Sequence, residues 1–269
     1  MNKTIGFIGG GNMAQAIIRG LLAAGHPAEK IAVADPGDAS QEALRAIDTG
    51  MLVSANNAEV ASAADVIVLA TKPQYIVQVA EEIADSNPEL VISVAAGITI
   101  ESLENALGES TPVVRIMPNT PALVGEGMAG LVGNKLVTDT EKAIANSIVD
   151  ATGEAIWLDN ESLMDAVTAI SGSGPAYFFL VMELLANGAK DFGFSEDVAR
   201  KLAVQTALGA ATLANSDDTD LNELRRRVTS PGGTTEAACN SLLDDDLAVI
   251  FRRALKAARD KSIELGKTD

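Results

Sequence analysis

The sequence predicts a two-part α/β protein, because the pattern of apolar residues changes sharply near residue 158. Before Trp157, short apolar runs alternate with stretches whose apolar residues recur at three- and four-residue spacing, which is typical of a βαβ array with a parallel sheet. After Trp157 only helical patterns follow. We therefore expect an α/β domain at residues 1–158 and an all-helical domain at residues 159–269.

The expected strands are short apolar runs, most of them bounded by polar or glycine residues. In chain order they are Thr4–Ile8, Ile31–Ala34, Val66–Ala70, Leu90–Val94 and Val113–Met117, with Met128–Val132 and Ala155–Leu158 expected at the sheet edge. Helical spacing between the strands predicts helices at Ala14–Leu22 and Ile76–Ile83, and Pro73 suits the first turn of the latter.

The second half of the chain predicts helices throughout. They are expected near Leu163–Ile170, Ala176–Phe192, Glu196–Ala214, Leu221–Val228, Thr235–Leu243 and Leu247–Leu265. Some, such as Ala203–Leu213, carry small or apolar residues on more than one face, and such a helix must be buried. Because such a short helical region can bury little core of its own, we expect the C-terminal domain to form at least a dimer.

Composition narrows the partners. The 269 residues include 47% hydrophobic ones, and 37 acidic against 20 basic residues give a net charge of −17. This charge repels nucleic acid and anionic membrane surfaces, so neither is an expected partner. No apolar run reaches the ~18 residues of a membrane span, the start of the chain lacks a signal-peptide pattern, and Cys239 is the only cysteine. We expect a cytoplasmic protein.

A glycine-rich segment predicts a dinucleotide site. The run Gly9-Gly10-Gly11-Asn12-Met13-Ala14 matches G-x-G-x-x-G/A between an expected strand and an expected helix. Gly9 permits a tight turn, Gly11 admits the pyrophosphate, and the helix N-terminus faces the phosphates. A turn that binds nothing is the alternative, but it does not account for this strand and helix context. We therefore expect a Rossmann-like domain that binds NADPH or NADH through Ile8, Gly9, Gly11, Asn12 and Met13.

Other strand ends should complete the crevice, since ligands bind at the carboxyl ends of parallel strands. The expected cofactor contacts there are Asn57, Ala70, Thr71, Lys72, Pro73, Ala95, Ala96 and Gly97, and the loop Met117–Pro121 lies at a further strand end. Lys72 is available to an anionic group, although a solvated surface lysine is the common alternative.

Asp35 bears on the choice of coenzyme. It ends the second expected strand, where an acidic side chain usually accepts hydrogen bonds from the adenosine ribose. Its charge favours NADH, because a 2′-phosphate would meet Asp35 with no basic residue before Arg45. The alternative is that Asp35 is a turn residue in Asp-Pro-Gly.

Two segments rich in glycine and hydroxyl groups precede expected helices. They are Ser171-Gly172-Ser173-Gly174-Pro175 and Ser230-Pro231-Gly232-Gly233-Thr234-Thr235-Glu236. Each would present free backbone N–H groups suited to a carboxylate. A plain helix–helix turn is the alternative for either segment alone.

The second segment, within Val228–Ala238, resembles the signature of the pyrroline-5-carboxylate reductase family, and Asp165–Tyr177 resembles that family's other motif. Lys72-Pro73, Ala95–Gly97 and Met117–Pro121 are also similar to family segments, so the resemblance spans nearly the whole chain. It implies reduction of L-1-pyrroline-5-carboxylate to L-proline by hydride transfer from NADPH or NADH, and a homo-oligomer built from interlaced dimers. Many members of the family prefer NADPH, and the charge of Asp35 puts the same preference in doubt for this chain.

The resemblance also assigns roles. An imine accepts hydride well when its nitrogen is protonated or hydrogen-bonded, and Thr235 matches the family's threonine, which makes it the candidate donor. The expected substrate contacts are the backbone of Gly232, Gly233 and Thr234, with Ser230 nearby and Glu161 as a further candidate.

Two other functions stay open. A β-hydroxyacid dehydrogenase shares the glycine loop but uses a lysine one turn after Gly-x-Gly, whereas Pro175-Ala176-Tyr177-Phe178 follows here. A non-catalytic NAD(P)H sensor would need no Thr235. The lone His26 stands at an expected helix end rather than in a catalytic pattern, and no His/Cys cluster indicates a metal.

Overall fold

The computed structural model describes residues 2–266 and divides into two compact units. One unit runs to Ser173 and includes the described residues from Ala258 onward, and the other is Gly174–Ala257. The units thus divide the chain at a later residue than the expected boundary at 158. A long-range contact accompanies this later division. Ser262 Oγ donates to Asp165 Oδ1 at 2.6 Å within the first unit, and this bond joins the last helix to the segment after the sheet.

The first unit is built on one eight-stranded sheet in the order β3-β2-β1-β4-β5-β6-β7-β8. The strands are β1 (Ile5–Ile8), β2 (Ile31–Ala34), β3 (Leu52–Ser54), β4 (Val66–Leu69), β5 (Leu90–Ser93), β6 (Val113–Met117), β7 (Gly127–Gly133) and β8 (Gly153–Trp157). All neighbours are parallel except β6 and β7. The seven expected strands form, with β8 at one edge and β7 beside it. β3, at the other edge, was not expected.

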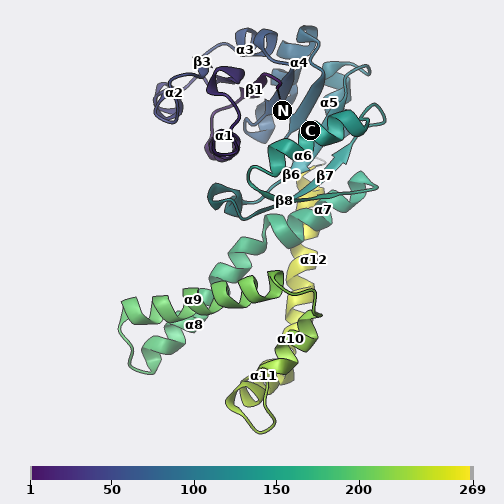
Figure 1. The fold of residues 1–269 in the computed structure, drawn as a ribbon. Coiled ribbons are helices and arrows are strands. Elements are labelled where there is room, and N and C mark those ends of the chain that lie inside the picture. Colours follow the sequence, from purple (N-terminus) through teal and green to yellow (C-terminus); the bar gives the residue numbers. More distant parts are fainter. Residues whose placement is uncertain (1, 267–269) are drawn as a thin grey trace. The chain divides into compact units, whose positions relative to one another are not determined.

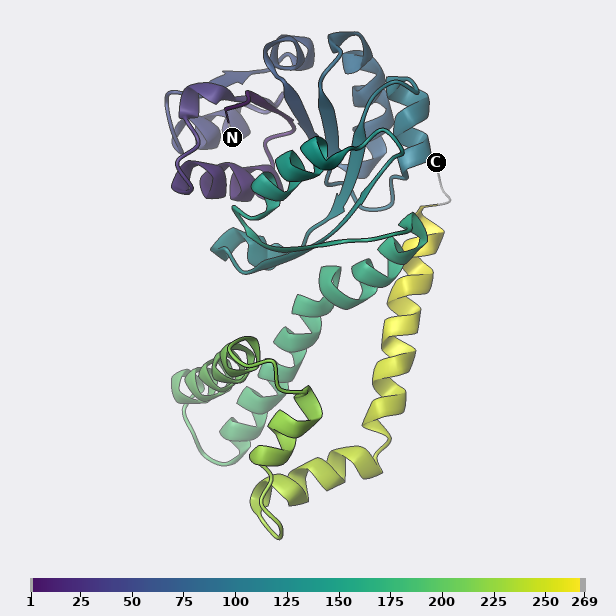
Figure 2. The same ribbon diagram turned by 45° about the vertical axis from the view of Figure 1, so that its right-hand side comes forward.

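Helices cover both faces of this sheet (Figures 1 and 2). On one face lie α1 (Asn12–Ala23), α2 (Asp38–Arg45) and α6 (Asp139–Val149), and on the other lie α3 (Asn57–Ala63), α4 (Ile76–Ile83) and α5 (Ile100–Leu107). The sheet is therefore buried from both sides, which explains why its central strands read as continuous apolar runs.

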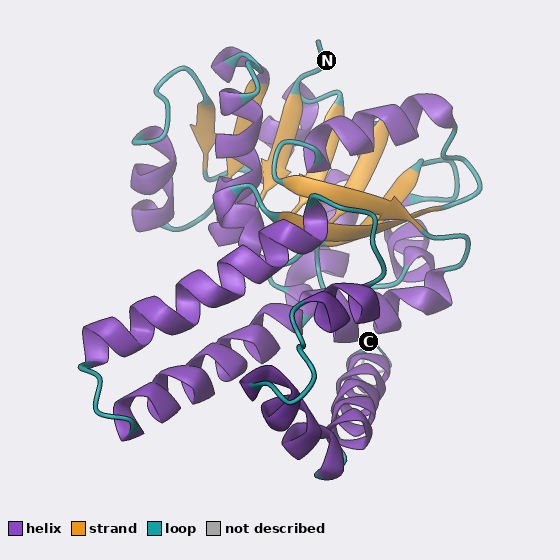
Figure 3. Ribbon diagram, turned by 60° about the horizontal axis from the view of Figure 1, so that its bottom comes forward, coloured by secondary structure: helices purple, strands orange, loops and turns teal. Residues whose placement is uncertain are grey.

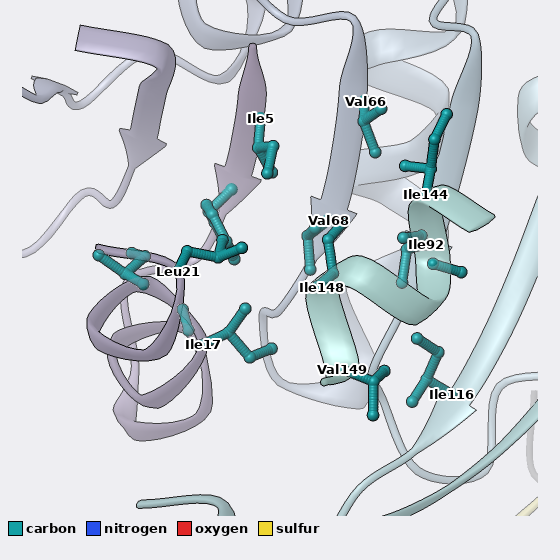
Figure 4. Packing of buried hydrophobic residues seen from close by; sticks show 14 of the residues in the cluster. Ile5, Ile17, Leu21, Val66, Val68, Ile92, Ile116, Ile144, Ile148 and Val149 are labelled. Atoms are coloured by element: carbon teal, nitrogen blue, oxygen red, sulfur yellow. The ribbon is translucent and has the colours of Figure 1, made fainter. Parts of the chain in front are cut away.

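Alternate strand residues face the two helix layers. Val68 packs in the core beneath α1 and α6, whereas Leu69 packs against the opposite layer. Figure 4 shows Ile17 from α1 and Ile148 from α6 beside the strand residues Val68 and Ile92. Every residue of β1 and β4 is buried, and the loops at their carboxyl ends therefore start from the centre of the core.

The chain after β8 is helical. A turn η5 (Glu161–Leu163), α7 (Met164–Val167) and a π-helical turn η6 (Thr168–Gly172) lead into α8 (Gly174–Asp191), followed by α9 (Glu196–Asn215), α10 (Leu221–Arg227), α11 (Thr234–Asp244) and α12 (Leu247–Leu265). Within the second unit α8 and α9 lie side by side (Figure 3). Each of the six expected helices is present, the first one as α7 and the π-helical turn.

The helices of the second unit leave large apolar side chains uncovered. Phe178 and Leu184 on α8 are 66% and 61% exposed, and Leu208 on α9 is 57% exposed. By length and composition alone, the helical run Glu161–Asp191 is apolar enough to cross a membrane, and only 11% of its most apolar window is buried. An apolar surface of this kind is typically buried against another protein chain or a membrane.

Candidate active site

Gly9 brings three strand ends together. Its φ of +102° is a conformation that favours glycine, and an added Cβ would lie 2.7 Å from the carbonyl carbon and oxygen of Ala70. Its N–H donates to Ala34 O at 2.8 Å. The turn after β1 is thereby packed against the ends of β2 and β4, as the glycine pattern predicts for a dinucleotide fingerprint.

Gly11 and the first turn of α1 form a setting for an anion. A Cβ on Gly11 would meet no atom within 4 Å, so the backbone is open on that side. Gly11 is the N-cap, no side chain caps the helix, and no acidic residue lies in its first turn. The first N–H groups, including those of Asn12 and Met13, therefore have no partner within the helix. These residues fit the diphosphate of a dinucleotide.

Asp35 and Asn57 are the residues that the sequence predicts to contact the adenosine half of a dinucleotide. Asp35 follows β2, is half-buried, and accepts a hydrogen bond at Oδ1 from Gly37 N at 2.9 Å. Asn57 is the first residue of α3, and its Nδ2 donates to Glu82 Oε2 at 2.8 Å. Both side chains thus have partners within the chain, and their contacts with a ribose stay predictions.

The loops after β4 and β5 complete the same edge of the sheet. Thr71 Oγ1 is buried and has no hydrogen-bond partner among the described residues, whereas Lys72 is exposed. Pro73 begins a short 3₁₀ turn. Ala95 is 5% exposed, Ala96 is exposed, and Gly97 has a φ of +83°. The orphan hydroxyl of Thr71 is a polar group that a bound ligand could satisfy.

Glu161 lies in the first unit and is part of a buried contact. Its Oε1 accepts from Arg115 Nη1 at 2.7 Å and from Ile100 N at 2.9 Å. Arg115 is only 5% exposed, so this pair anchors the segment after β8 to the sheet and α5. The sequence reasoning missed Arg115 because a single charge within a strand gives no sign of its partner. Whether Glu161 also contacts a substrate stays a prediction.

The loop before α11 gathers the other expected site residues in the second unit. Gly232 has a φ of +71°, and its N–H donates to Glu236 Oε2 at 2.7 Å, while Gly233 N donates to Ser230 O at 3.0 Å. Both glycine N–H groups therefore have partners, one in the first turn of α11 and the other in the loop. The first turn of α11 has no capping side chain, which leaves the N–H groups of Thr234 and Thr235 available.

The same loop shows a residue that the sequence reasoning did not assign. Glu236 stands three residues after the N-cap Gly233, which is the spacing of a capping box, and here it reaches back to Gly232. The side chain of Thr235 is half-buried, whereas Ser230 and Thr234 are exposed. A hydroxyl and two open amides thus lie together at the start of one helix.

Comparison with known proteins agrees with both halves of this description. Residues 161–265 match a family model described as pyrroline-5-carboxylate reductase dimerisation, and residues 4–97 match one described as NADP oxidoreductase coenzyme F420-dependent. A pyrroline-5-carboxylate reductase from Pseudomonas aeruginosa is 48% identical over 98% of this chain and 97% of its own length.

Solved structures of the same family are also similar to this chain over its full length. A pyrroline-5-carboxylate reductase from Coxiella burnetii is 41% identical with a TM-score of 0.94 and full coverage of both chains. The pyrroline carboxylate reductase of Plasmodium falciparum, solved with NADP bound, is 32% identical with a TM-score of 0.87 over 99% of each chain. With its dinucleotide fingerprint and helical dimerisation domain, this chain belongs to the pyrroline-5-carboxylate reductase family of NAD(P)H-dependent oxidoreductases.

Proposed function

We propose that this chain reduces L-1-pyrroline-5-carboxylate to L-proline, the final step of proline synthesis, with Thr235 as the residue that assists the reaction. The observation that carries this proposal is the start of α11, where the Thr235 hydroxyl and two available backbone N–H groups lie together. A small cyclic imine with a carboxylate needs both kinds of group.

The roles follow from the chemistry. When bound, the reduced nicotinamide supplies a hydride to the imine carbon. Thr235 donates a hydrogen bond to the imine nitrogen, which makes the neighbouring carbon a better hydride acceptor. The N–H groups of Thr234 and Thr235 hold the carboxylate at the positive end of the helix. Gly232, Gly233 and Ser230 shape the loop, because their mutual contacts and the bond to Glu236 fix its turn.

Residues of the first unit would hold the cofactor. Gly11, Asn12 and Met13 fit the diphosphate through open backbone groups, and Thr71 offers an unsatisfied hydroxyl at the adjacent strand end. The charge of Asp35 favours NADH over NADPH.

The dimer that we propose is interlaced, with the Thr235 loop of one chain serving the nucleotide domain of its partner. The exposed apolar side chains on α8 and α9 support burial against a second chain. A dimerisation surface also accounts for the apolar run Glu161–Asp191 without a membrane. We place the protein in the cytoplasm, where its single Cys239 is suited to reducing conditions.

An NAD(P)H oxidation assay tests the function. Turnover is expected with L-1-pyrroline-5-carboxylate and none with β-hydroxyacids and oxidised coenzyme, since no lysine follows Gly174 at the position that a β-hydroxyacid dehydrogenase requires. Turnover of hydroxyacids alone would instead support that dehydrogenase. Coenzyme binding without turnover of either substrate would make the protein a sensor.

A further inference from the structure

Pro175 leaves a gap in the helical hydrogen bonds where the π-helical turn meets α8. In an α-helix the N–H of residue 175 would donate to the carbonyl of Ser171, but proline has no N–H. The chain forms a π-helical turn here, in which Ser173 N donates to Thr168 O at 2.8 Å. The Ser171 carbonyl receives its hydrogen bond from Asn119 Nδ2 at 3.0 Å, a donor that lies far away in the sequence.

Asn119 is held from both sides. Its Oδ1 accepts from Met128 N in β7 at 2.9 Å, and the residue is only 9% exposed. Beside it, a Cβ on Gly172 would lie 2.6 Å from Met117 Cε, so the π-helical turn packs directly on the last residue of β6. One buried amide thus joins the loop after β6, β7 and the π-helical turn, and both of its polar atoms are satisfied.

The loop that contains Asn119 belongs to the cofactor edge of the sheet. It follows the parallel strand β6, and the next turn η4 (Thr120–Val124) packs against α1, the helix after the glycine fingerprint. In doubly wound folds β4 to β6 form the half that receives the nicotinamide nucleotide. Asn119 is therefore placed between the nicotinamide half of the crevice and the turn that continues into α8.

We propose that Asn119 is a positioning residue for hydride transfer, and that it acts by fixing the π-helical turn of the Ser171–Pro175 motif to the strand-end loop of the nicotinamide half. The proposal rests on the proposed reductase function. In this proposal the Ser171–Pro175 motif has a role distinct from substrate binding, because the carbonyl of Ser171 accepts the hydrogen bond from the strand-end loop. The donor Nδ2 is the atom on which this role depends.

Two substitutions remove the donor. Asn119→Asp keeps an acceptor for Met128 N and removes the donor to Ser171, and Asn119→Ala removes both groups without burying a charge. The matched control is Asn134, a half-buried asparagine that follows β7 and contacts Val113 at the start of β6, the end opposite to Asn119. Its Nδ2 donates to Thr111 O and Glu104 Oε1, and its Oδ1 accepts from Val113 N. The controls Asn134→Asp and Asn134→Ala therefore break similar bonds away from the cofactor edge.

The first measurement does not depend on turnover. NADH is added to the full-length protein, and amide hydrogen exchange is followed over residues 168–174. In the wild type and the Asn134 variants we expect NADH to slow this exchange, because the strand-end loop and the turn are joined. In the Asn119 variants the slowing should be lost while NADH still binds, as read from nicotinamide fluorescence. Slowing that persists without the Nδ2 donor would overturn the proposal.

The second measurement is kinetic. With coenzyme deuterated at the transferred position, the Asn119 variants should show a kcat lowered roughly tenfold, a larger isotope effect on kcat and a nearly unchanged KM for NADH, because misplacement slows hydride transfer itself. The Asn134 variants should show no rise in the isotope effect, even where their Tm falls. An unchanged isotope effect in Asn119→Ala, or an equal rise in Asn134→Ala, would refute the role of Asn119.

The wild-type assay separates this proposal from the function on which it rests. If wild-type protein fails to reduce L-1-pyrroline-5-carboxylate, the proposed function fails, whatever the exchange data show. If it turns over the imine but the Asn119 and Asn134 variants behave alike, only the positioning role fails. If Asn119→Asp does not fold, Asn119→Ala against Asn134→Ala decides in its place.

Discussion

The carboxylate of Asp35 is tied to the glycine fingerprint, because its Oδ2 accepts a hydrogen bond from Gly10 N at 2.8 Å. Its other oxygen accepts from Gly37 N at 2.9 Å. The charge that we expect to select the coenzyme is thus also a structural support for the loop. Two effects of one side chain, its charge and its hydrogen bonds, have to be separated by experiment.

Asp35→Asn removes the charge and keeps one acceptor oxygen. We expect the ratio of kcat/KM for NADPH to that for NADH to rise roughly tenfold, because the repulsion of a 2′-phosphate is lost. Asp48→Asn is the control, since Asp48 Oδ1 accepts from Gly50 N at 2.8 Å in a similar turn before β3. Steady-state kinetics with both coenzymes give the two ratios. An unchanged ratio in Asp35→Asn would remove Asp35 from the ribose site.

Gly9 and Gly11 should respond in opposite ways to alanine. Gly9→Ala is expected to lower Tm markedly, because its positive φ and the Ala70 backbone leave no place for a Cβ. Gly11→Ala should leave Tm nearly unchanged, since its φ is −68° and the space is open, but weaken NADH binding roughly tenfold or more. Thermal melts and fluorescence titration check both. Equal cofactor affinity in Gly11→Ala and wild type would contradict a diphosphate at this position.

Much of the fold could be predicted from the sequence, for physical reasons visible at particular residues. β4 and β5 can be recognised because both of their faces are buried, so all of their residues except Ser93 are apolar. β3 was missed because it has only three residues and Leu52 is 39% exposed, which leaves no hydrophobic pattern. The sequence does not show that the compact unit extends to Ser173, because the contact between Asp165 and Ser262 joins residues that are far apart in the chain.

The site was predictable to the level of segments rather than of atoms. The spacing from Gly9 to Ala14 determines a backbone shape, and the structure shows that shape. No spacing rule indicates that Gly232 N–H is already bonded to Glu236, or that Asn119 supplies the donor for Ser171. Such contacts depend on tertiary placement, which a local pattern does not contain.

Thr235→Ala should lower kcat by ~10²-fold or less and leave coenzyme binding intact, because one hydrogen-bond donor to the imine is lost. Thr235→Ser should recover most of the activity, since it restores the hydroxyl. Ser241→Ala, which removes an exposed hydroxyl further along α11, is the control. Turnover is measured at saturating coenzyme. Full activity in Thr235→Ala would exclude Thr235 from the mechanism.

His26 should make stability depend on pH. Burial lowers the pKa of its imidazole, which is only 8% exposed and has a buried Nε2 without a partner among the described residues. Below the ordinary histidine pKa of about 6.5 the unfolded chain then binds a proton that the folded chain does not. The contribution of His26 is therefore full above that pH and is lost as the pH falls towards the folded-state value.

The test of this sign uses His26→Gln, which cannot titrate. His26 is the only histidine of the chain, so no other imidazole changes charge in the same range. Between about pH 7.5 and 5.5 the Tm of the wild type should fall more steeply than that of the variant. Parallel Tm curves for the two proteins would show that the imidazole titrates alike in the folded and unfolded chains.

Interlaced sites should allow two inactive chains to complement each other. Gly11→Val disables the nucleotide half and Thr235→Ala the helical half, so in a purified heterodimer of these variants one of the two shared sites carries neither change. We expect about half of the wild-type turnover, because a dimer has two equivalent sites. The crossed control pairs wild type with the Gly11→Val/Thr235→Ala double variant, and there each shared site carries one change and activity should be low. If each site instead forms within one chain, the crossed pair should keep about half of the wild-type turnover, because its wild-type chain holds an intact site. The heterodimer of the two single variants should then have low activity.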